Sequence, residues 1–261
     1  MELNLDLKVA LVTGASKGIG LAITRALAEE GVRVAAGALH GSPELEQLGK
    51  THDVYPVRVD LADASGPDAL VSAALKRFGQ LDILVNNVGG VRPSLNGFLS
   101  VSDADWDWTL TLNFLAAART MRAALPALLR REDSSIVTIS SVNAALPDPT
   151  VIDYSAAKGA LTNLCKSLSK EFGGKVRVNT ISPGPVQTDL WLGTEGVAAV
   201  VANASGATPD SVAHDAASQS VTGRFSRPDE IADLVLFLAS SRAANITGSD
   251  YAIDGGLVTT V

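Results

Sequence analysis

A glycine-rich turn near the N-terminus constrains the fold more than any other stretch of the chain. Residues 8–12 form an apolar run, residues 13–20 read Thr-Gly-Ala-Ser-Lys-Gly-Ile-Gly, and residues 21–30 have helical periodicity. A strand that turns through glycines into a helix brings backbone N–H groups and the positive end of the helix dipole to a phosphate. The stretch therefore predicts a nucleotide site, although a purely structural glycine turn could have the same residues.

Strand-like and helix-like segments alternate along the rest of the chain. Short apolar runs typical of strands occur at residues 31–37, 54–59, 81–85, 136–139, 176–181 and 251–253. Helical patterns occur at residues 67–78, 102–131 and 228–239. This alternation is typical of a parallel α/β sheet. The chain has 261 residues, 46% of them hydrophobic, with no internal repeat or linker, so we expect a single domain over 1–261.

Charge and cysteine content exclude several classes of protein. A net charge of -7 argues against a nucleic-acid partner, because such proteins concentrate Lys and Arg on one face. Cys165 is the only cysteine and the three histidines are scattered, so we expect no disulfide and no metal site. No signal peptide or long apolar run is found. We therefore expect a cytoplasmic protein with no membrane partner.

The reaction chemistry is expected in residues 140–158. Tyr154 and Lys158 are four apart in a helical stretch, so a phenol and an ammonium share one face. An adjacent cation lowers the pKa of a phenol from about 10 and makes it a proton donor or acceptor nearer neutrality. Ser141 follows the strand 136–139 and could present its hydroxyl to the same point, so three groups would surround one carbonyl oxygen. A Tyr–Lys pair at this spacing is also common on helix surfaces.

Asparagines occupy two other places where a ligand could lie. Asn86 and Asn87 follow the strand 81–85, at the edge where parallel sheets bind ligands, although an Asx turn would explain them equally well. Asn113 lies on an otherwise apolar helix surface, where an amide needs a partner. It could make a helix-packing hydrogen bond or hold a water beside the reaction centre.

Residues 188–222 are rich in Ala, Ser and Gly and contain no Lys or Arg. We expect this segment to be a mobile lid with short helical pieces that selects the substrate; the alternative is a variable surface excursion. Neither this segment nor residues 142–153 carries a charged cluster beyond Asp148 and Asp153. An apolar or uncharged small-molecule substrate is therefore expected.

These motifs, in this order, resemble the short-chain dehydrogenase/reductase family, in particular its 3-oxoacyl reductases, over nearly the whole chain. The resemblance implies a Rossmann-type doubly wound α/β domain, with a seven-stranded parallel sheet and helices on both faces. It implies that Tyr154 is the general acid or base, and that Lys158 lowers its pKa and holds the nicotinamide ribose. It also implies that Ser141 steadies the substrate oxygen and that Asn113 anchors a relay water.

The resemblance further implies which residues bind the cofactor, besides Tyr154 and Lys158. In chain order they are Gly14, Ser16, Lys17, Gly18, Ile19, Gly20, Asp60, Leu61, Asn87, Gly89, Pro183, Gly184, Val186 and Thr188. Val88 stands where relatives usually carry alanine, so two extra methyl groups must fit close to the cofactor. A homotetramer or homodimer, formed through the helices that contain Asn113 and Tyr154, is implied as well.

The end of the second strand should meet the adenosine ribose. NAD sites usually place a carboxylate there, which would repel a 2′-phosphate, and by alignment with the family pattern this position is Ala38. Lys17 and His40 could supply positive charge, although Leu39 stands where many NADP-using relatives have an arginine. We therefore expect a moderate preference for NADP(H), with NAD(H) as the alternative.

The leading hypothesis is an NAD(P)H-dependent oxidoreductase that interconverts a ketone and a secondary alcohol. A second is a 3-oxoacyl-thioester ketoreductase, in which Arg130, Arg131 and Lys175 would receive an acidic carrier protein. A third is a non-catalytic nucleotide sensor, which is disfavoured because Tyr154 and Lys158 are retained. An enoyl reductase of the same superfamily would usually space these two residues more widely.

Overall fold

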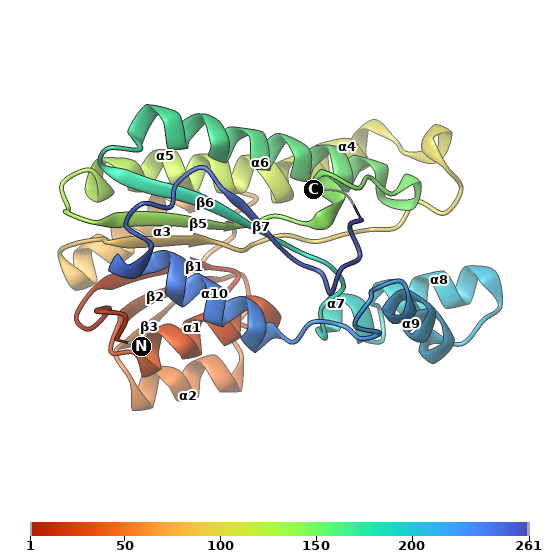
Figure 1. Ribbon diagram of the computed structural model, residues 1–261, viewed down its shortest axis with the longest axis horizontal. Coiled ribbons are helices and arrows are strands. Elements are labelled where there is room, and N and C mark those ends of the chain that lie inside the picture. The colour runs from red at the N-terminus through yellow and green to blue at the C-terminus, as the bar shows by residue number, and fades with distance from the viewer. Residues whose placement is uncertain (1, 260–261) are drawn as a thin grey trace.

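The computed structural model describes residues 2–259, which contain a seven-stranded sheet covered by helices (Figure 1). The strands are β1 (Val9–Thr13), β2 (Arg33–Ala38), β3 (Val54–Arg58), β4 (Ile83–Asn86), β5 (Ser134–Ile139), β6 (Val176–Pro183) and β7 (Asp250–Ile253). The helices are α1 (Gly18–Glu29), α2 (Pro43–Thr51), α3 (Gly66–Phe78), α4 (Asp103–Leu110), α5 (Ala116–Leu128), α6 (Ile152–Phe172), α7 (Asp189–Leu192), α8 (Val197–Ser205), α9 (Pro209–Ser218) and α10 (Pro228–Ala239).

The sheet is parallel throughout, with the strand order β3-β2-β1-β4-β5-β6-β7. The chain builds outward from β1 to β3 and then crosses to β4, from which it builds outward in the other direction. The carboxyl ends of β1 and β4 are therefore neighbours, with Val12 in register with Val85. In a doubly wound sheet this reversal opens a crevice for ligands. The predicted fold class is confirmed.

Local sequence explains why these elements form. All five residues of β1 are buried, as expected of an apolar strand that is covered on both faces of a parallel sheet. Helix α2 begins at Ser42, whose side chain accepts a hydrogen bond from the Leu45 N–H. Helix α4 begins with a capping box between Ser102 and Asp105.

Helices cover both faces of the sheet (Figure 1), and an apolar layer lies between the sheet and the helices on each face. On one face α1, α2 and α10 pack on the sheet through side chains that include Ile23, Leu27, Leu45, Ile231 and Val235. On the other face α3, α5 and α6 pack through side chains that include Leu70, Met121, Leu128, Leu161 and Cys165. Burial of apolar area on both faces is what stabilises this arrangement.

The helix predicted over 102–131 is divided in the structure. Between α4 and α5 lies a π-helical turn, Thr111–Leu115, which contains Asn113. We call this segment the π-turn. Apolar periodicity does not reveal a π-turn, because the extra residue shifts the pattern only locally. Helix α2 was not predicted, because Leu45 and Leu48 are its only buried residues.

The segment predicted as a lid contains α7, α8 and α9, which pack on one another and extend beyond the end of the sheet (Figure 1). Trp191 of α7 contacts Phe225 edge to face, with ring centroids 5.3 Å apart. Leu190 and Leu192, also on α7, are 41% and 50% exposed, so this end of the molecule presents apolar side chains to solvent.

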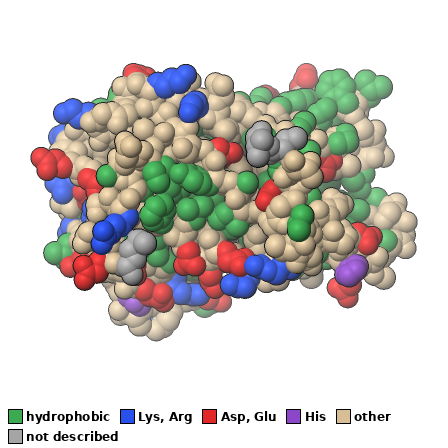
Figure 2. All heavy atoms as spheres, in the orientation of Figure 1, with side chains coloured by type: hydrophobic (Ala, Val, Ile, Leu, Met, Phe, Trp, Pro, Cys, Tyr) green, Lys and Arg blue, Asp and Glu red, His purple; other side chains and the backbone are tan. Residues whose placement is uncertain are grey.

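On the face shown in Figure 2, Lys and Arg side chains lie among Asp and Glu side chains, and apolar side chains gather near the centre. This face therefore has no continuous basic patch for a phosphate backbone. Within residues 2–259, none of the helices combines the length and apolar composition that crossing a bilayer requires.

Replacing Gly20 tests whether the close approach of α1 to the glycine turn requires a glycine at this position. A Cβ at this position would overlap the Gly14 carbonyl oxygen, so we expect Gly20→Ala to lower the free energy of unfolding by about 1–3 kcal/mol. Gly174→Ala is the matched control, because a Cβ there meets nothing within 4 Å. Urea unfolding of both variants is the measurement. Equal stability of the two variants would contradict the prediction.

Candidate active site

Thr13 joins the ends of the two central strands. Its hydroxyl oxygen accepts hydrogen bonds from the N–H groups of Asn87 and Val88, at 2.9 and 3.1 Å, and its hydroxyl donates to the Val85 carbonyl at 3.4 Å. One buried side chain therefore fixes the glycine turn against the segment after β4. Sequence reasoning missed this role, since a threonine at a strand end has no distinctive pattern.

The glycine turn packs closely against neighbouring segments in a backbone conformation that favours glycine. Gly14 and Gly18 adopt φ angles of +67° and +55°, which L side chains rarely reach. A Cβ at Gly14 would meet the Asn87 amide at 2.9 Å, and a Cβ at Gly18 would meet Thr188 at 3.2 Å. Helix α1 begins here without a side-chain cap, which leaves its first N–H groups for a pyrophosphate.

Asn87 holds the turn from the opposite side. Its side-chain nitrogen donates to the carbonyl oxygens of Thr13 and Gly14, at 3.0 and 3.2 Å. It therefore bridges two strand ends instead of forming the local Asx turn considered above. The neighbouring Val88 packs against the apolar layer under α5 and α6, which accommodates its two additional methyl groups.

The residues predicted for the two ends of the cofactor lie on either side of this turn. Asp60 is exposed beyond the end of β3, where its carboxylate accepts a hydrogen bond from the Ala62 N–H at 2.9 Å, and Leu61 is buried. Pro183 ends β6, and the Gly184 N–H donates to the Ile253 carbonyl at 3.0 Å. The chain then turns back so that Thr188 reaches Gly18.

Lys158 is buried, with only 3% of its surface exposed. Its Nζ donates a 2.9 Å hydrogen bond to the carbonyl of Ile139 at the end of β5 and lies 5.6 Å from the Tyr154 ring centroid. A Cβ at Gly89 would lie 3.7 Å from the same nitrogen. The predicted pair is therefore brought together at the strand ends and is not a solvated surface pair.

The pKa values of this pair differ from the sequence-based expectation. Burial raises the pKa of the Tyr154 phenol, and the nearby Ser141 hydroxyl acts in the opposite direction. Burial also lowers the pKa of Lys158 from 10.5 to about 8. The net shift of the Tyr154 pKa in the protein alone is therefore upward, because desolvation is its largest cause. That Lys158 lowers this pKa during the reaction stays a prediction.

Ser141 lies at the start of the segment between β5 and α6, where it is 7% exposed. Its hydroxyl donates to the side-chain oxygen of Asn143 at 3.1 Å and accepts from the Asn143 N–H at 3.2 Å. Asn143 therefore orients the hydroxyl, a contact that sequence reasoning missed. A polar residue two positions after a serine is the signal that could have found it.

The side-chain amide of Asn113 binds the backbone of Gly90 through both its oxygen and its nitrogen. Its side-chain oxygen accepts from the Gly90 N–H at 3.0 Å, and its nitrogen donates to the Gly90 carbonyl at 2.9 Å. The same nitrogen donates to the Thr109 carbonyl at 3.1 Å. A Cβ at Gly89 would approach the Asn113 oxygen to 2.8 Å, so a glycine is needed there.

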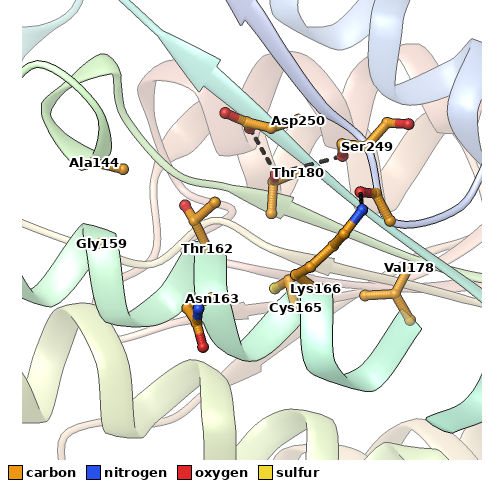
Figure 3. Close-up of a pocket in the computed structure, with 11 residues that line it drawn as sticks. Ala144, Gly159, Thr162, Asn163, Cys165, Lys166, Val178, Thr180, Ser249 and Asp250 are labelled. Atoms are coloured by element: carbon orange, nitrogen blue, oxygen red, sulfur yellow. Dashed lines mark hydrogen bonds between the residues drawn. The ribbon is translucent and has the colours of Figure 1, made fainter. Parts of the chain in front are cut away.

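A cavity of about 400 Å³ lies away from these residues, between α6 and the β6–β7 edge (Figure 3). Thr180 donates to the Asp250 carboxylate at 2.6 Å, and Lys166 donates to the Gly248 carbonyl at 2.6 Å. Cys165 also lines this cavity, and burial raises the pKa of its thiol to about 11. The thiol is therefore protonated at neutral pH and a poor nucleophile.

Comparison with known proteins decides the family. Residues 14–258 match the family described as enoyl-(acyl carrier protein) reductase, and several relatives match along almost the whole chain. The chain belongs to the short-chain dehydrogenase/reductase family. D-threitol dehydrogenase of Mycolicibacterium smegmatis is 38% identical, over 98% of this chain and 94% of its own. The 3-oxoacyl-[acyl-carrier-protein] reductase FabG of Thermotoga maritima is 32% identical, over 98% of this chain and 100% of its own.

Solved structures of family members have the same fold. L-sorbose reductase from Gluconobacter frateurii, complexed with NADPH and L-sorbose, superposes with a TM-score of 0.91 and 32% identity over 100% of both chains. Aldohexose dehydrogenase from Thermoplasma acidophilum superposes with a TM-score of 0.88 and 28% identity over 100% of this chain and 98% of its own. The predicted enzyme class is confirmed: this short-chain dehydrogenase/reductase is an NAD(P)-dependent oxidoreductase that interconverts a ketone and an alcohol.

The buried Lys158 predicts a specific dependence of stability on pH. Its pKa is about 8 in the folded enzyme against 10.5 as the reference for the unfolded chain, so the unfolded chain binds more protons between these values. The stability of the unmodified enzyme relative to Lys158→Met should therefore rise between about pH 8 and pH 10.5, by up to about 3 kcal/mol. Urea unfolding at several pH values measures this difference.

Lys50→Met is the matched control, because Lys50 is exposed on α2. Its stability should follow that of the unmodified enzyme over the same pH range. Parallel curves for the unmodified enzyme and Lys158→Met would show that the buried amine does not titrate in this window.

Proposed function

We propose that Tyr154 transfers the proton that accompanies hydride transfer. A nicotinamide held beside Lys158 would supply the hydride to the carbonyl carbon of a ketone. The Tyr154 phenol donates its proton to the carbonyl oxygen. The Ser141 hydroxyl, which donates to Asn143 in the protein alone, would turn to donate a hydrogen bond to the same oxygen. In the reverse direction, the phenolate accepts the proton of the secondary alcohol. The observation that carries this proposal is the group formed by the buried Ser141 and Lys158 and the half-buried Tyr154, where the end of β5 meets the start of α6.

Lys158 would assist in two ways. One of its N–H groups binds the Ile139 carbonyl, and the others remain for the ribose hydroxyls of the cofactor. Its positive charge would favour the phenolate form of Tyr154 during proton transfer. Asn113 would hold the π-turn against Gly90, so that the backbone beside Lys158 can bind a relay water.

Replacing Tyr154 by Phe tests this role. The variant should bind cofactor normally but turn over a ketone substrate roughly 10²- to 10⁴-fold more slowly, because the proton carrier is lost. Cofactor absorbance during ketone reduction is the measurement. Tyr251→Phe is the control, since Tyr251 lies on the edge strand β7 and should retain its turnover. If Tyr154→Phe kept a turnover close to that of the unmodified enzyme, the assignment of Tyr154 as the proton carrier would be wrong.

A preference for NADP(H) over NAD(H) is supported by the charges near the end of β2. Ala38 offers no carboxylate to repel a 2′-phosphate. Lys17 is exposed in the glycine turn, and the side chain of Arg58, in register with Ala38 on β3, is exposed too. The charge of the Arg58 side chain would add to the positive charge near the adenosine ribose. The solved complex of L-sorbose reductase with NADPH favours the same cofactor.

Titrating NADPH and NADH against the cofactor-free protein measures this preference. NADPH should bind more tightly, and Lys17→Ala should weaken NADPH binding by roughly 5- to 50-fold while NADH binding changes little, since a charged contact to the phosphate is worth about 1–2 kcal/mol. Lys50→Ala serves as the control for a general loss of positive charge. Tighter NADH binding, with NADPH affinity unchanged in Lys17→Ala, would overturn the assignment.

For the substrate, we infer an uncharged, hydroxylated ketone or its alcohol. The relatives named for threitol, sorbose and aldohexose support this class, as does the absence of Lys and Arg from residues 188–222. A 3-oxoacyl thioester is the second candidate, favoured by the likeness to the acyl-carrier-protein reductase. A panel with ketoses and a 3-oxoacyl thioester separates the two. If the enzyme turned over the thioester and none of the ketoses, the 3-oxoacyl thioester would replace the hydroxylated ketone as the proposed substrate.

Three further features belong to this proposal. Residues 188–222 would act as a lid over the substrate, because α7–α9 pack mainly on one another and can move as a unit. The long helices α4–α6 would form the interface of a homodimer or homotetramer. A cytoplasmic location fits the single, buried and unpaired cysteine, Cys165.

A further inference from the structure

A buried carboxylate next to the proposed proton carrier has no part in the reaction described so far. Asp153 immediately precedes Tyr154 and is only 2% exposed. Its Oδ2 accepts a hydrogen bond from the Thr109 hydroxyl. Its Oδ1 has no hydrogen-bond partner among residues 2–259 and borders a cavity of about 270 Å³. A buried carboxylate with one contact and one free oxygen is costly, so its presence calls for an explanation.

Thr109 connects this carboxylate to the π-turn. It lies on α4, four residues before Asn113, and is 1% exposed. Its hydroxyl binds Asp153, and its carbonyl accepts the 3.1 Å hydrogen bond from the Asn113 side chain. The same Asn113 amide binds both polar groups of Gly90. A continuous series of hydrogen bonds therefore runs from the first turn of α6 to the segment after β4.

The π-turn needs such contacts to persist. A π-helical turn is rare, because its i to i+5 spacing widens the helix and leaves some carbonyls without their usual backbone donor. Here the side-chain nitrogen of Asn113 donates a hydrogen bond to the Thr109 carbonyl, while the Ala116 N–H donates to the Thr111 carbonyl. The bond to Asp153 then ties the side chain of the same Thr109 to α6.

We propose that Asp153 is a positioning residue: its hydrogen bond to Thr109 fixes the turn that carries Tyr154 against the π-turn that carries Asn113. The inference rests on the roles proposed above for Tyr154 and Asn113. Displacements of about 1 Å in a reacting group can cost on the order of 10²-fold in rate. A link between the two helices at this point therefore controls the rate without touching substrate or cofactor.

The cavity beside Asp153 predicts which replacement is tolerated. Polar side chains border it, including Arg92, Ser94 and Asn96, so the outer atom of residue 153 faces a polar space. In Asp153→Asn, the amide oxygen can still accept from Thr109 while the amide nitrogen faces this space. Asp153→Ala removes the acceptor and leaves the Thr109 hydroxyl buried without a partner.

The test compares two threonine variants of similar burial. Thr109→Val removes the hydroxyl that binds Asp153, whereas Thr120→Val, the control, removes a buried hydroxyl that bonds only to Ala116 in its own helix. Thr109→Val should lower kcat by roughly 10- to 100-fold with KM and the Kd for NADPH unchanged, and Thr120→Val should stay within about twofold.

Variants at Asp153 complete a double-mutant cycle. Asp153→Ala should lose as much kcat as Thr109→Val, and the double variant should lose no more than either single variant. Asp153→Asn should regain most of the turnover lost in Asp153→Ala. Additive losses in the double variant, or equal losses in Asp153→Asn and Asp153→Ala, would contradict the proposed link.

Hydrogen exchange provides a readout that does not depend on catalysis. In the cofactor-free protein, the amides of residues 111–115 should exchange about tenfold faster in Thr109→Val than in Thr120→Val. Unchanged exchange over these residues, or equal loss of kcat in the two variants, would overturn the inference. If Tyr154→Phe kept its turnover, the proposed proton transfer would fail, and the exchange experiment would still decide whether Asp153 holds the π-turn.

Discussion

Close approach of backbone at the carboxyl ends of β1 and β4 is the constraint on which the rest of the site depends. The glycine turn, the segment after β4 and the start of α1 meet at distances that a Cβ at Gly14 or Gly20 would prevent, and a Cβ at Gly89 would meet Asn113 of the π-turn. Thr13 and Asn87 satisfy the backbone groups exposed by this approach. The close packing at the glycine turn and the position of the π-turn beside Lys158 thus both depend on the lack of side chains on three glycines.

Burial of ionisable groups is the second physical theme. Desolvation moves the pKa of Tyr154 up and that of Lys158 down to about 8, so both groups shift toward their neutral forms in the protein alone. Such shifts are costly to stability and are typical of sites where protons move. The nearby Cys165 is also held neutral, but it borders a cavity that none of the proposed catalytic residues lines. Burial alone therefore does not mark the reaction centre, and the convergence of several polar groups does.

Much of the architecture follows from local patterns. The glycine turn and the apolar strands, such as β1 with all residues buried, can be recognised because periodicity and turn chemistry are properties of neighbouring residues. The spacing of Tyr154 and Lys158 likewise predicts a shared face on one helix. The π-turn and the short helix α2 could not be predicted, since one extra residue or two buried leucines leave too weak a pattern.

The sequence by itself determined the fold class, the location of the nucleotide turn and the residue types available for proton transfer, because each is encoded by residues close together in the chain. Only the tertiary structure decided which distant groups meet: Thr13 with Asn87, and Thr109 with Asp153. It also decided the direction of the pKa shift at Tyr154, which depends on how far the surrounding elements exclude water. Contacts across strands and helices, and the desolvation they cause, are set by packing and are not written in any single stretch of residues.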